Sequence, residues 1–233
     1  MIEAEWWEYD SLGELAEAVA GDVGFIVDSA VDARGSSLIA VPGGKTGPAI
    51  FPKLASQKLP WKKVAIIPTD DRLVPMDDER SNVRAIAKTF LPLGARVVPI
   101  AADIADYRLA GNSADARLQE LPWPPDLVWL GMGQDGHTAS LFAGPDLQDA
   151  LDAPKARRAV GVMPDPLPQD APVARVTLTR ASILAARTVL ITITGDDKRA
   201  LLEQAIADGQ SSKLPIGRVL AEAEQPIDIH WCP

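Results

Sequence analysis

The chain has 233 residues, of which 47% are hydrophobic, and a formal net charge of −9 at pH 7. This length and apolar content predict a single domain, spanning residues 1–233, with a substantial core. The negative charge disfavours nucleic acids and anionic membranes as partners, and an anionic ligand needs a local cluster of Lys and Arg in order to bind.

The cysteine content and the N-terminal residues bear on the compartment. The one cysteine, Cys232, excludes an intramolecular disulfide and suits a reducing compartment. The first residues, MIEAEWWEYD, lack the basic start and apolar core of a signal peptide, and no apolar run approaches membrane-spanning length. We therefore expect a cytoplasmic protein that is a monomer or a small homo-oligomer.

Strand and helix patterns alternate along the chain. Strands are predicted over residues 6–9, 37–41, 64–68, 96–100, 127–130, 173–178, 188–194 and 227–231. Helices are predicted over residues 11–32, 46–57, 81–91, 112–119, 196–207 and 216–223, and residues 69–79 are predicted to form a polar loop. This order predicts a Rossmann-like α/β fold whose largely parallel central sheet is flanked by helices. Ligands in such folds bind beyond the carboxyl ends of the strands.

The most informative stretch is LVWLGMGQDGHTASLF, residues 127–142. A buried strand runs into three glycines, Gly131, Gly133 and Gly136, and then into a short predicted helix after His137. The glycine spacing satisfies the dinucleotide-binding fingerprint, but that motif needs a long helix next, whereas Gly144-Pro145 ends this one early. The stretch therefore predicts a site of another kind.

A second glycine-containing loop, PGGKTG, follows the predicted strand at residues 37–41. Gly44, Lys45 and Thr46 are similar to the end of a nucleotide phosphate loop, but the glycine that motif requires is replaced by Ile39. Two interpretations remain equally supported. The loop either holds one phosphate at a helix N-terminus or is a tight turn with an exposed lysine.

Charged side chains also follow later strands. Asp70, Asp71 and Arg72 lie where a strand end faces the predicted site, and Arg72 either binds phosphate or holds its loop by ion pairs. Arg175 lies on one face of a predicted strand. Lys198 falls in the first turn of a helix, where a cation opposes the helix dipole and indicates a partner anion.

These segments together resemble the glucosamine-6-phosphate isomerase/6-phosphogluconolactonase family, and within it the lactonases. The resemblance rests on GMGQDGHTASLF, PGGKTG, TDDRLVP with SN, ARVTLT and GDDK, in this order over most of the chain. The isomerase/deaminase relatives have a catalytic Glu five residues after the His, where this chain has Phe142. Lys45, Gly47 and Asp71 also depart from the usual residues of the family.

The resemblance implies hydrolysis of 6-phospho-D-glucono-1,5-lactone to 6-phosphogluconate, in the pentose phosphate pathway. In this hypothesis His137 is the general base, Asp135 orients it, and N–H groups of Gly43–Gly44 or Gly133–Gly136 stabilise the oxyanion. The further residues expected to bind substrate or phosphate are Lys45, Thr46, Asp70, Arg72, Arg175 and Lys198. With two histidines and no Gly-x-Ser-x-Gly elbow, we expect neither a metal, a cofactor nor a covalent serine nucleophile.

Two alternatives of other classes remain. One is an amino-sugar-phosphate isomerase/deaminase, which Phe142 disfavours because an apolar ring cannot carry a proton. The other is a sugar-phosphate-binding protein without catalysis, which would not need His137 or Asp135. The second histidine, His230, is expected to be structural.

Overall fold

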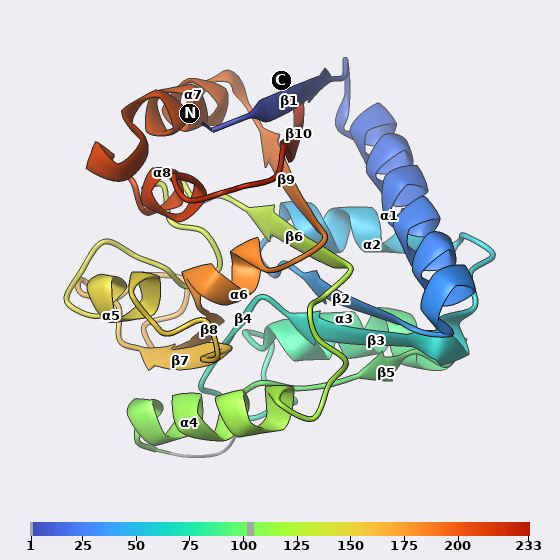
Figure 1. Cartoon of the computed structure of the whole chain (residues 1–233), viewed down its shortest axis with the longest axis horizontal. Helices are drawn as coiled ribbons and strands as arrows, with labels where there is room; N and C mark the ends of the chain where they lie inside the picture. Colours follow the sequence, from blue (N-terminus) through green and yellow to red (C-terminus); the bar gives the residue numbers. More distant parts are fainter. Residues whose placement is uncertain (1, 102–104) are drawn as a thin grey trace.

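The computed structural model describes residues 2–101 and 105–233 (Figure 1). Seven strands form one parallel sheet in the order β1-β10-β9-β6-β2-β3-β5. Their bounds are β1 Ala4–Glu8, β2 Ser37–Val41, β3 Val64–Pro68, β5 Arg96–Val97, β6 Leu127–Gly131, β9 Thr188–Thr194 and β10 Ile227–Cys232. The predicted fold class, an α/β protein with a largely parallel central sheet, is confirmed.

Helices cover both faces of this sheet (Figure 1). On one face lie α1 (Leu12–Arg34), α2 (Thr46–Ala55) and α3 (Asn82–Phe90); on the other lie α4 (Tyr107–Leu118), α5 (Leu147–Leu151), α6 (Arg180–Leu184), α7 (Asp196–Asp208) and α8 (Pro215–Leu220). Short 3₁₀ turns occupy Trp61–Lys63, Leu91–Leu93 and Gly209–Ser211. Among the described residues, no helix is both long and apolar enough to cross a membrane.

The alternation of side chains along the strands explains the layers. In β2, which is buried throughout, Leu38 and Ala40 face the α4–α8 core, whereas Ile39 and Val41 face the α1–α3 core. A central parallel strand is buried on both sides, so its sequence reads as a continuous apolar run.

Helix starts follow the capping residues in the sequence. Ser11 caps α1 by accepting from the Glu14 N–H, and Ser81 caps α3 in the same way. Asp106 caps α4, so this helix begins at Tyr107 rather than at the predicted residue 112. The strand predicted over residues 96–100 is assigned only at Arg96–Val97.

A second, antiparallel sheet was not predicted. It consists of β4 (Asp70–Arg72), β8 (Arg175–Leu178) and β7 (Ala159–Val162), in that order. The prediction of a continuous polar loop over residues 69–79 was therefore wrong at its start. The charged strand β4 is stabilised by pairing with β8, a long-range contact that local patterns do not reveal.

The short helix predicted after His137 is also wrong. Residues 138–141 form a tight turn, in which the Leu141 N–H donates to the Thr138 carbonyl and Ala139 has a φ of 48°. The Ser140 N–H donates to Thr177 Oγ1 of β8, which fixes the turn against the small sheet. These tertiary contacts outweigh the local helical tendency.

The strand order places the site. The chain winds from β2 through β3 to β5 in one direction, whereas β6, β9 and β10 lie on the other side of β2. The loops that follow the neighbouring strands β2 and β6 therefore diverge at a topological switch point, where open α/β sheets bind ligands. Both glycine-rich loops singled out in the sequence begin there.

Candidate active site

A cavity of about 220 Å³ opens at this switch point. Its wall consists of loop residues that follow β2, β3, β6 and β9, together with residues of the small sheet: Pro42, Gly43, Gly44, Lys45, Thr46, Gly47, Thr69, Asp70, Arg72, Asn82, Gly131, Met132, Gly133, His137, Ala139, Asp170, Arg175 and Lys198. Of the residues predicted for the site, Asp135 and Gly136 do not line this cavity, and Asp135 contacts His137 instead.

His137 and Asp135 form a close pair. Nδ1 of His137 lies 2.5 Å from Oδ1 of Asp135, and the His137 N–H also donates to this oxygen. Burial acts to raise the pKa of Asp135, but the hydrogen bond and charge of His137 outweigh it, so the pKa is lowered. An ionised Asp135 favours the tautomer with the proton on Nδ1, which leaves Nε2 free to accept a proton.

Gly133 makes room for the imidazole. A Cβ on Gly133 would lie 2.2 Å from the His137 ring, so no larger residue fits without moving that ring. The Gly133 N–H donates to the His137 carbonyl, and the Gly136 N–H donates to the Gly133 carbonyl. Because these two N–H groups are already used, the expectation that Gly133–Gly136 stabilise an oxyanion loses its support there.

The loop after β2 offers N–H groups instead. Gly44 has a φ of 71°, and α2 begins directly behind it at Thr46. The described part of the chain provides no acceptor for the N–H groups of Gly44 and Lys45. Together with the helix N-terminus, they form a setting that favours a negative charge.

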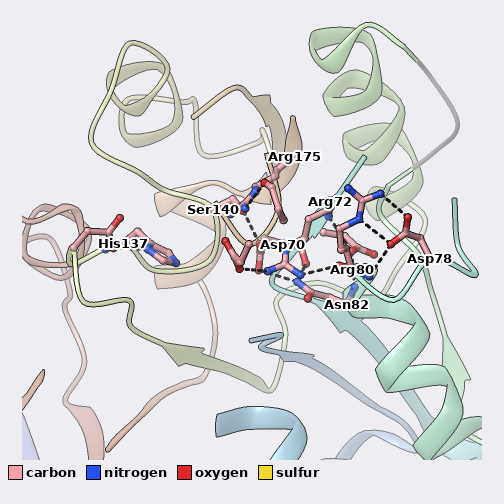
Figure 2. Close-up of polar contacts among 12 residues, drawn as sticks. Asp70, Arg72, Asp78, Arg80, Asn82, His137, Ser140 and Arg175 are labelled. Atoms are coloured by element: carbon pink, nitrogen blue, oxygen red, sulfur yellow. Dashed lines mark hydrogen bonds and ion pairs between the residues drawn. The ribbon is translucent and has the colours of Figure 1, made fainter. Parts of the chain in front are cut away.

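A buried network connects β4 of the small sheet to the start of α3 and to the turn at residues 138–141 (Figure 2). Asp70 is 6% exposed and accepts from Ser140 Oγ at 2.5 Å. The Asn82 side chain donates to the Asp70 carbonyl, and a Cβ on Gly43 would lie 2.0 Å from Asn82 Oδ1. Gly43 is therefore required for the close approach of α3 to the cavity.

Asp71 shapes the loop that carries Asn82. Its carboxylate accepts from the N–H groups of Arg72, Asn82 and Val83. Burial nevertheless raises the pKa of Asp71 to about 6. An Asp at this position, in place of the family's usual Glu, thus still reaches the start of α3.

Arg72 and Arg175 are paired residues of β4 and β8. Both side chains line the cavity and both have a buried Nε for which the described chain provides no acceptor. Arg175 is 2% exposed, and burial lowers its pKa, although a guanidinium stays protonated in proteins. Two adjacent cations, one buried and one half-buried, with free donors favour the binding of an anion.

Arg72 also holds its loop, as one of the two interpretations from the sequence predicted, whereas its binding of phosphate stays a prediction. Its Nη1 donates to the Arg80 carbonyl at 2.7 Å, and Arg80 in turn binds Asp78 through two of its nitrogens (Figure 2). The hydrogen bonds from Arg80 lower the pKa of Asp78. The other nearby carboxylate, Asp170, lies 3.8 Å from Arg72 Nη2 and is exposed.

Lys198 reaches the cavity from the first turn of α7. Its Nζ donates to the Met132 carbonyl at 2.6 Å. Burial, followed by the charge of Lys45, lowers the pKa of Lys198. The charged form of Lys198 would be stabilised by an anion bound between its ammonium group and that of Lys45.

Three polar wall residues were not among the predicted site residues: Thr69, Asn82 and Asp170. Asn82 lies in a quoted motif, but only the structure places its amide against Gly43. Asp170 lies in a proline-containing segment with no recognisable motif. Among the described residues, no group of three or more His, Cys, Asp or Glu is placed to hold a metal ion.

Comparison with known proteins identifies the family. The model of the family described as "Glucosamine-6-phosphate isomerases/6-phosphogluconolactonase" matches residues 10–231. The 6-phosphogluconolactonase of Rhizobium meliloti (strain 1021) is 38% identical over 229 residues, which are 97% of either chain. The crystal structure of a 6-phosphogluconolactonase from Shewanella baltica OS155 has a TM-score of 0.90 and 30% identity, and the match covers 99% of this chain and 98% of that one. The chain therefore belongs to the glucosamine-6-phosphate isomerase/6-phosphogluconolactonase family.

Proposed function

We propose that this protein hydrolyses 6-phospho-D-glucono-1,5-lactone to 6-phospho-D-gluconate, a step of the pentose phosphate pathway, with His137 as general base. The observation that carries the proposal is the short contact between His137 and Asp135 at the wall of a cavity that also contains Arg72, Arg175, Lys45 and Lys198. The near full-length relatives named 6-phosphogluconolactonase support the same reaction.

The reaction begins with water at C1 of the lactone. Nε2 of His137 takes a proton from this water while its oxygen forms a bond to C1. The positive charge that develops on the imidazole is stabilised by Asp135, which accepts from Nδ1. A base positioned in this way contributes about 10²–10⁴-fold to the rate.

The tetrahedral intermediate carries its negative charge on the former carbonyl oxygen. The N–H groups of Gly44 and Lys45, at the start of α2, are the donors assigned to this oxygen. The bond between C1 and the ring oxygen then breaks, and the His137 imidazolium returns its proton to that oxygen. The product is a carboxylic acid, which releases one proton to solvent at neutral pH.

The 6-phosphate needs cations because the protein as a whole is negatively charged. Arg175 and Arg72 provide buried guanidinium donors, and Lys198 and Lys45 provide ammonium groups at the opposite loops of the cavity wall. Thr46 adds a hydroxyl at the helix start. The reaction as written needs no cofactor or metal ion, because a lactone carbonyl is reactive enough for activated water.

The isomerase/deaminase alternative lacks its acid/base group. The position of that Glu holds Phe142, whose ring cannot exchange protons. The alternative of a binding protein without catalysis leaves the His137–Asp135 pair without a role. We place the enzyme in the cytoplasm, because its single thiol, Cys232, is free and buried, and expect a monomer or small homo-oligomer.

The test is proton release on addition of freshly generated 6-phosphogluconolactone, with spontaneous hydrolysis subtracted. We expect the wild type to accelerate release and His137→Ala to lose about 10²–10⁴-fold of this acceleration while it still binds 6-phosphogluconate. Ammonia release from glucosamine 6-phosphate, measured in parallel, would favour the deaminase instead. Binding of 6-phosphogluconate without any acceleration by the wild type would favour the binding protein.

A further inference from the structure

The aromatic ring of Phe142 lies between two functional side chains. It is stacked on the His137 imidazole, with ring centres 4.1 Å apart and an interplanar angle of 22°. The guanidinium carbon of Arg175 lies 4.8 Å from the centre of the same ring. One apolar side chain therefore contacts both the general base and a cation assigned to phosphate.

Phe142 itself stands behind the cavity rather than in its wall, as far as the described residues show. It follows the tight turn at residues 138–141, which Ser140 fixes by bonds to Thr177 and Asp70. The preceding Leu141 is 1% exposed and belongs to the core. The backbone that carries Phe142 is thus held by the small sheet and the core, independently of any ligand, and the ring itself is half-buried.

A histidine ring needs such support. The terminal torsion of an imidazole is broad, so one hydrogen bond at Nδ1 restrains the ring without fixing its plane. Gly133 lies against one part of the ring, since a Cβ there would be 2.2 Å away, and Asp135 holds Nδ1. The stack with Phe142 supplies the remaining restraint, because it sets the plane of the ring and thereby the direction of Nε2.

Arg175 needs support for a similar reason. Of its donors, Nη2 bonds the Ala171 carbonyl, whereas Nε is buried without an acceptor in the described chain. A guanidinium over an aromatic face is attracted by the ring and keeps its donors free for an anion. Phe142 can therefore hold Arg175 without occupying the groups that would bind phosphate.

We propose that Phe142 is a positioning residue for lactone hydrolysis, whose ring fixes the His137 imidazole and the Arg175 guanidinium relative to each other. The inference rests on the proposed function, because it assumes that C1 of the substrate lies at His137 and its phosphate at Arg175. The residue that replaces the acid/base Glu of the isomerases thus has a role of its own. It contributes a flat surface, not a proton.

The experiment compares Phe142→Leu, which removes the flat ring, with Phe142→Tyr, which keeps it. We expect Phe142→Leu to lower kcat for 6-phosphogluconolactone at least about 10-fold, because His137 loses its alignment, and to raise KM by no more than about 3-fold through Arg175, since the ring itself does not touch substrate. Phe142→Tyr should stay within about 3-fold of wild type. Equal kcat values for all three proteins, or an equal loss in both variants, would overturn the inference.

A second measurement does not depend on activity. The chain has only two histidines, so the ring protons of His137 can be assigned by comparison with the spectrum of His137→Ala. We expect nuclear Overhauser contacts between the His137 and Phe142 rings in the wild type, and their absence would overturn the inference even if Phe142→Leu does not fold. If the wild type does not accelerate hydrolysis while the contacts are present, the proposed function fails and the stacked geometry stands.

Discussion

The two histidines have similar partners but different surroundings. His137 contacts Asp135 at 2.5 Å and stacks on Phe142, and its side chain is 30% exposed at a cation-lined cavity. His230, on β10, contacts the Tyr9 hydroxyl at 2.9 Å, lies 3.6 Å from Asp22 and stacks with Tyr9. It is 1% exposed.

The difference shows that a histidine with a carboxylate and an aromatic neighbour is not by itself a catalytic site. Burial lowers the pKa of His230 to about 4, so this ring is neutral at physiological pH; it is hydrogen-bonded to the Tyr9 hydroxyl, whereas Asp22, at 3.6 Å, lies beyond hydrogen-bond distance. His230 does not line the cavity that contains His137. His137 differs because the glycines around it leave room for a ligand. Substitution of His137 should therefore lower the reaction rate, whereas substitution of His230 should lower the stability of the fold.

The largest expected effect concerns the stability of the wild type in acid. The pKa of His230 is depressed from 6.5 to about 4 in the folded state. The stability that depends on the neutral form of His230 is therefore complete above pH 6.5 and is lost as the pH falls toward 4. At 1.36 kcal/mol per unit this amounts to about 3 kcal/mol. Urea unfolding at pH 7 and pH 4 should therefore show a larger acid loss in the wild type than in His230→Gln. Equal losses would contradict the assignment of this shift to His230.

Crowding the His137 ring should have the next largest effect. In Gly133→Ala the added methyl overlaps the imidazole, and a displacement of about 1 Å at a base can cost about 10²-fold in kcat. The matched control is Gly21→Ala in α1, away from the cavity, whose methyl meets no atom within 4 Å. A kcat loss in Gly21→Ala as large as that in Gly133→Ala would show that the His137 contact is not the cause.

Removal of the carboxylate that orients His137 should cost less. We expect Asp135→Asn to lower kcat about 10-fold, because the imidazolium loses its charge partner while the cavity keeps its shape. Asp149→Asn, which removes the same charge from an exposed position of α5, provides the control in steady-state assays. An unchanged kcat in Asp135→Asn would mean that the short contact has no part in the reaction.

The smallest expected effect is at Asp170. Its exposed carboxylate lies 3.8 Å from Arg72 Nη2, where it competes with the substrate phosphate. The effect should be small, because exposed ion pairs contribute little free energy. Asp170→Asn should lower KM about 2-fold with kcat unchanged, whereas Asp165→Asn, in the same loop, should leave KM as it is. A higher KM in Asp170→Asn would indicate that this carboxylate helps to bind substrate.

Much of the fold and of the His137 site follows from local sequence. Alternating strand and helix patterns predicted the parallel sheet, and the glycines at 131, 133 and 136 marked the loop that makes room for a ring. The loop after β2 was likewise visible, because it follows a buried strand directly. These features are local, so one stretch of sequence contains them.

The small antiparallel sheet could not be predicted in the same way. β4 is a charged segment whose pairing with β8 joins residues more than a hundred positions apart. The neighbouring guanidinium groups of Arg72 and Arg175 are a result of that pairing. The tight turn at Ala139, and with it the stack of Phe142 on His137, also depends on contacts with β8 and Asp70.

The measurement that tests the comparison most directly uses two variants, His137→Gln and His230→Gln, each of which keeps one histidine. Both are assayed for proton release from 6-phosphogluconolactone, and the unfolding curve of each is measured. We predict that His137→Gln loses about 10²–10⁴-fold in kcat with unchanged stability, and that His230→Gln keeps its kcat and is less stable at neutral pH. A His137→Gln variant that retains wild-type kcat, or a folded His230→Gln variant that loses it, would contradict the assignment of catalysis to His137.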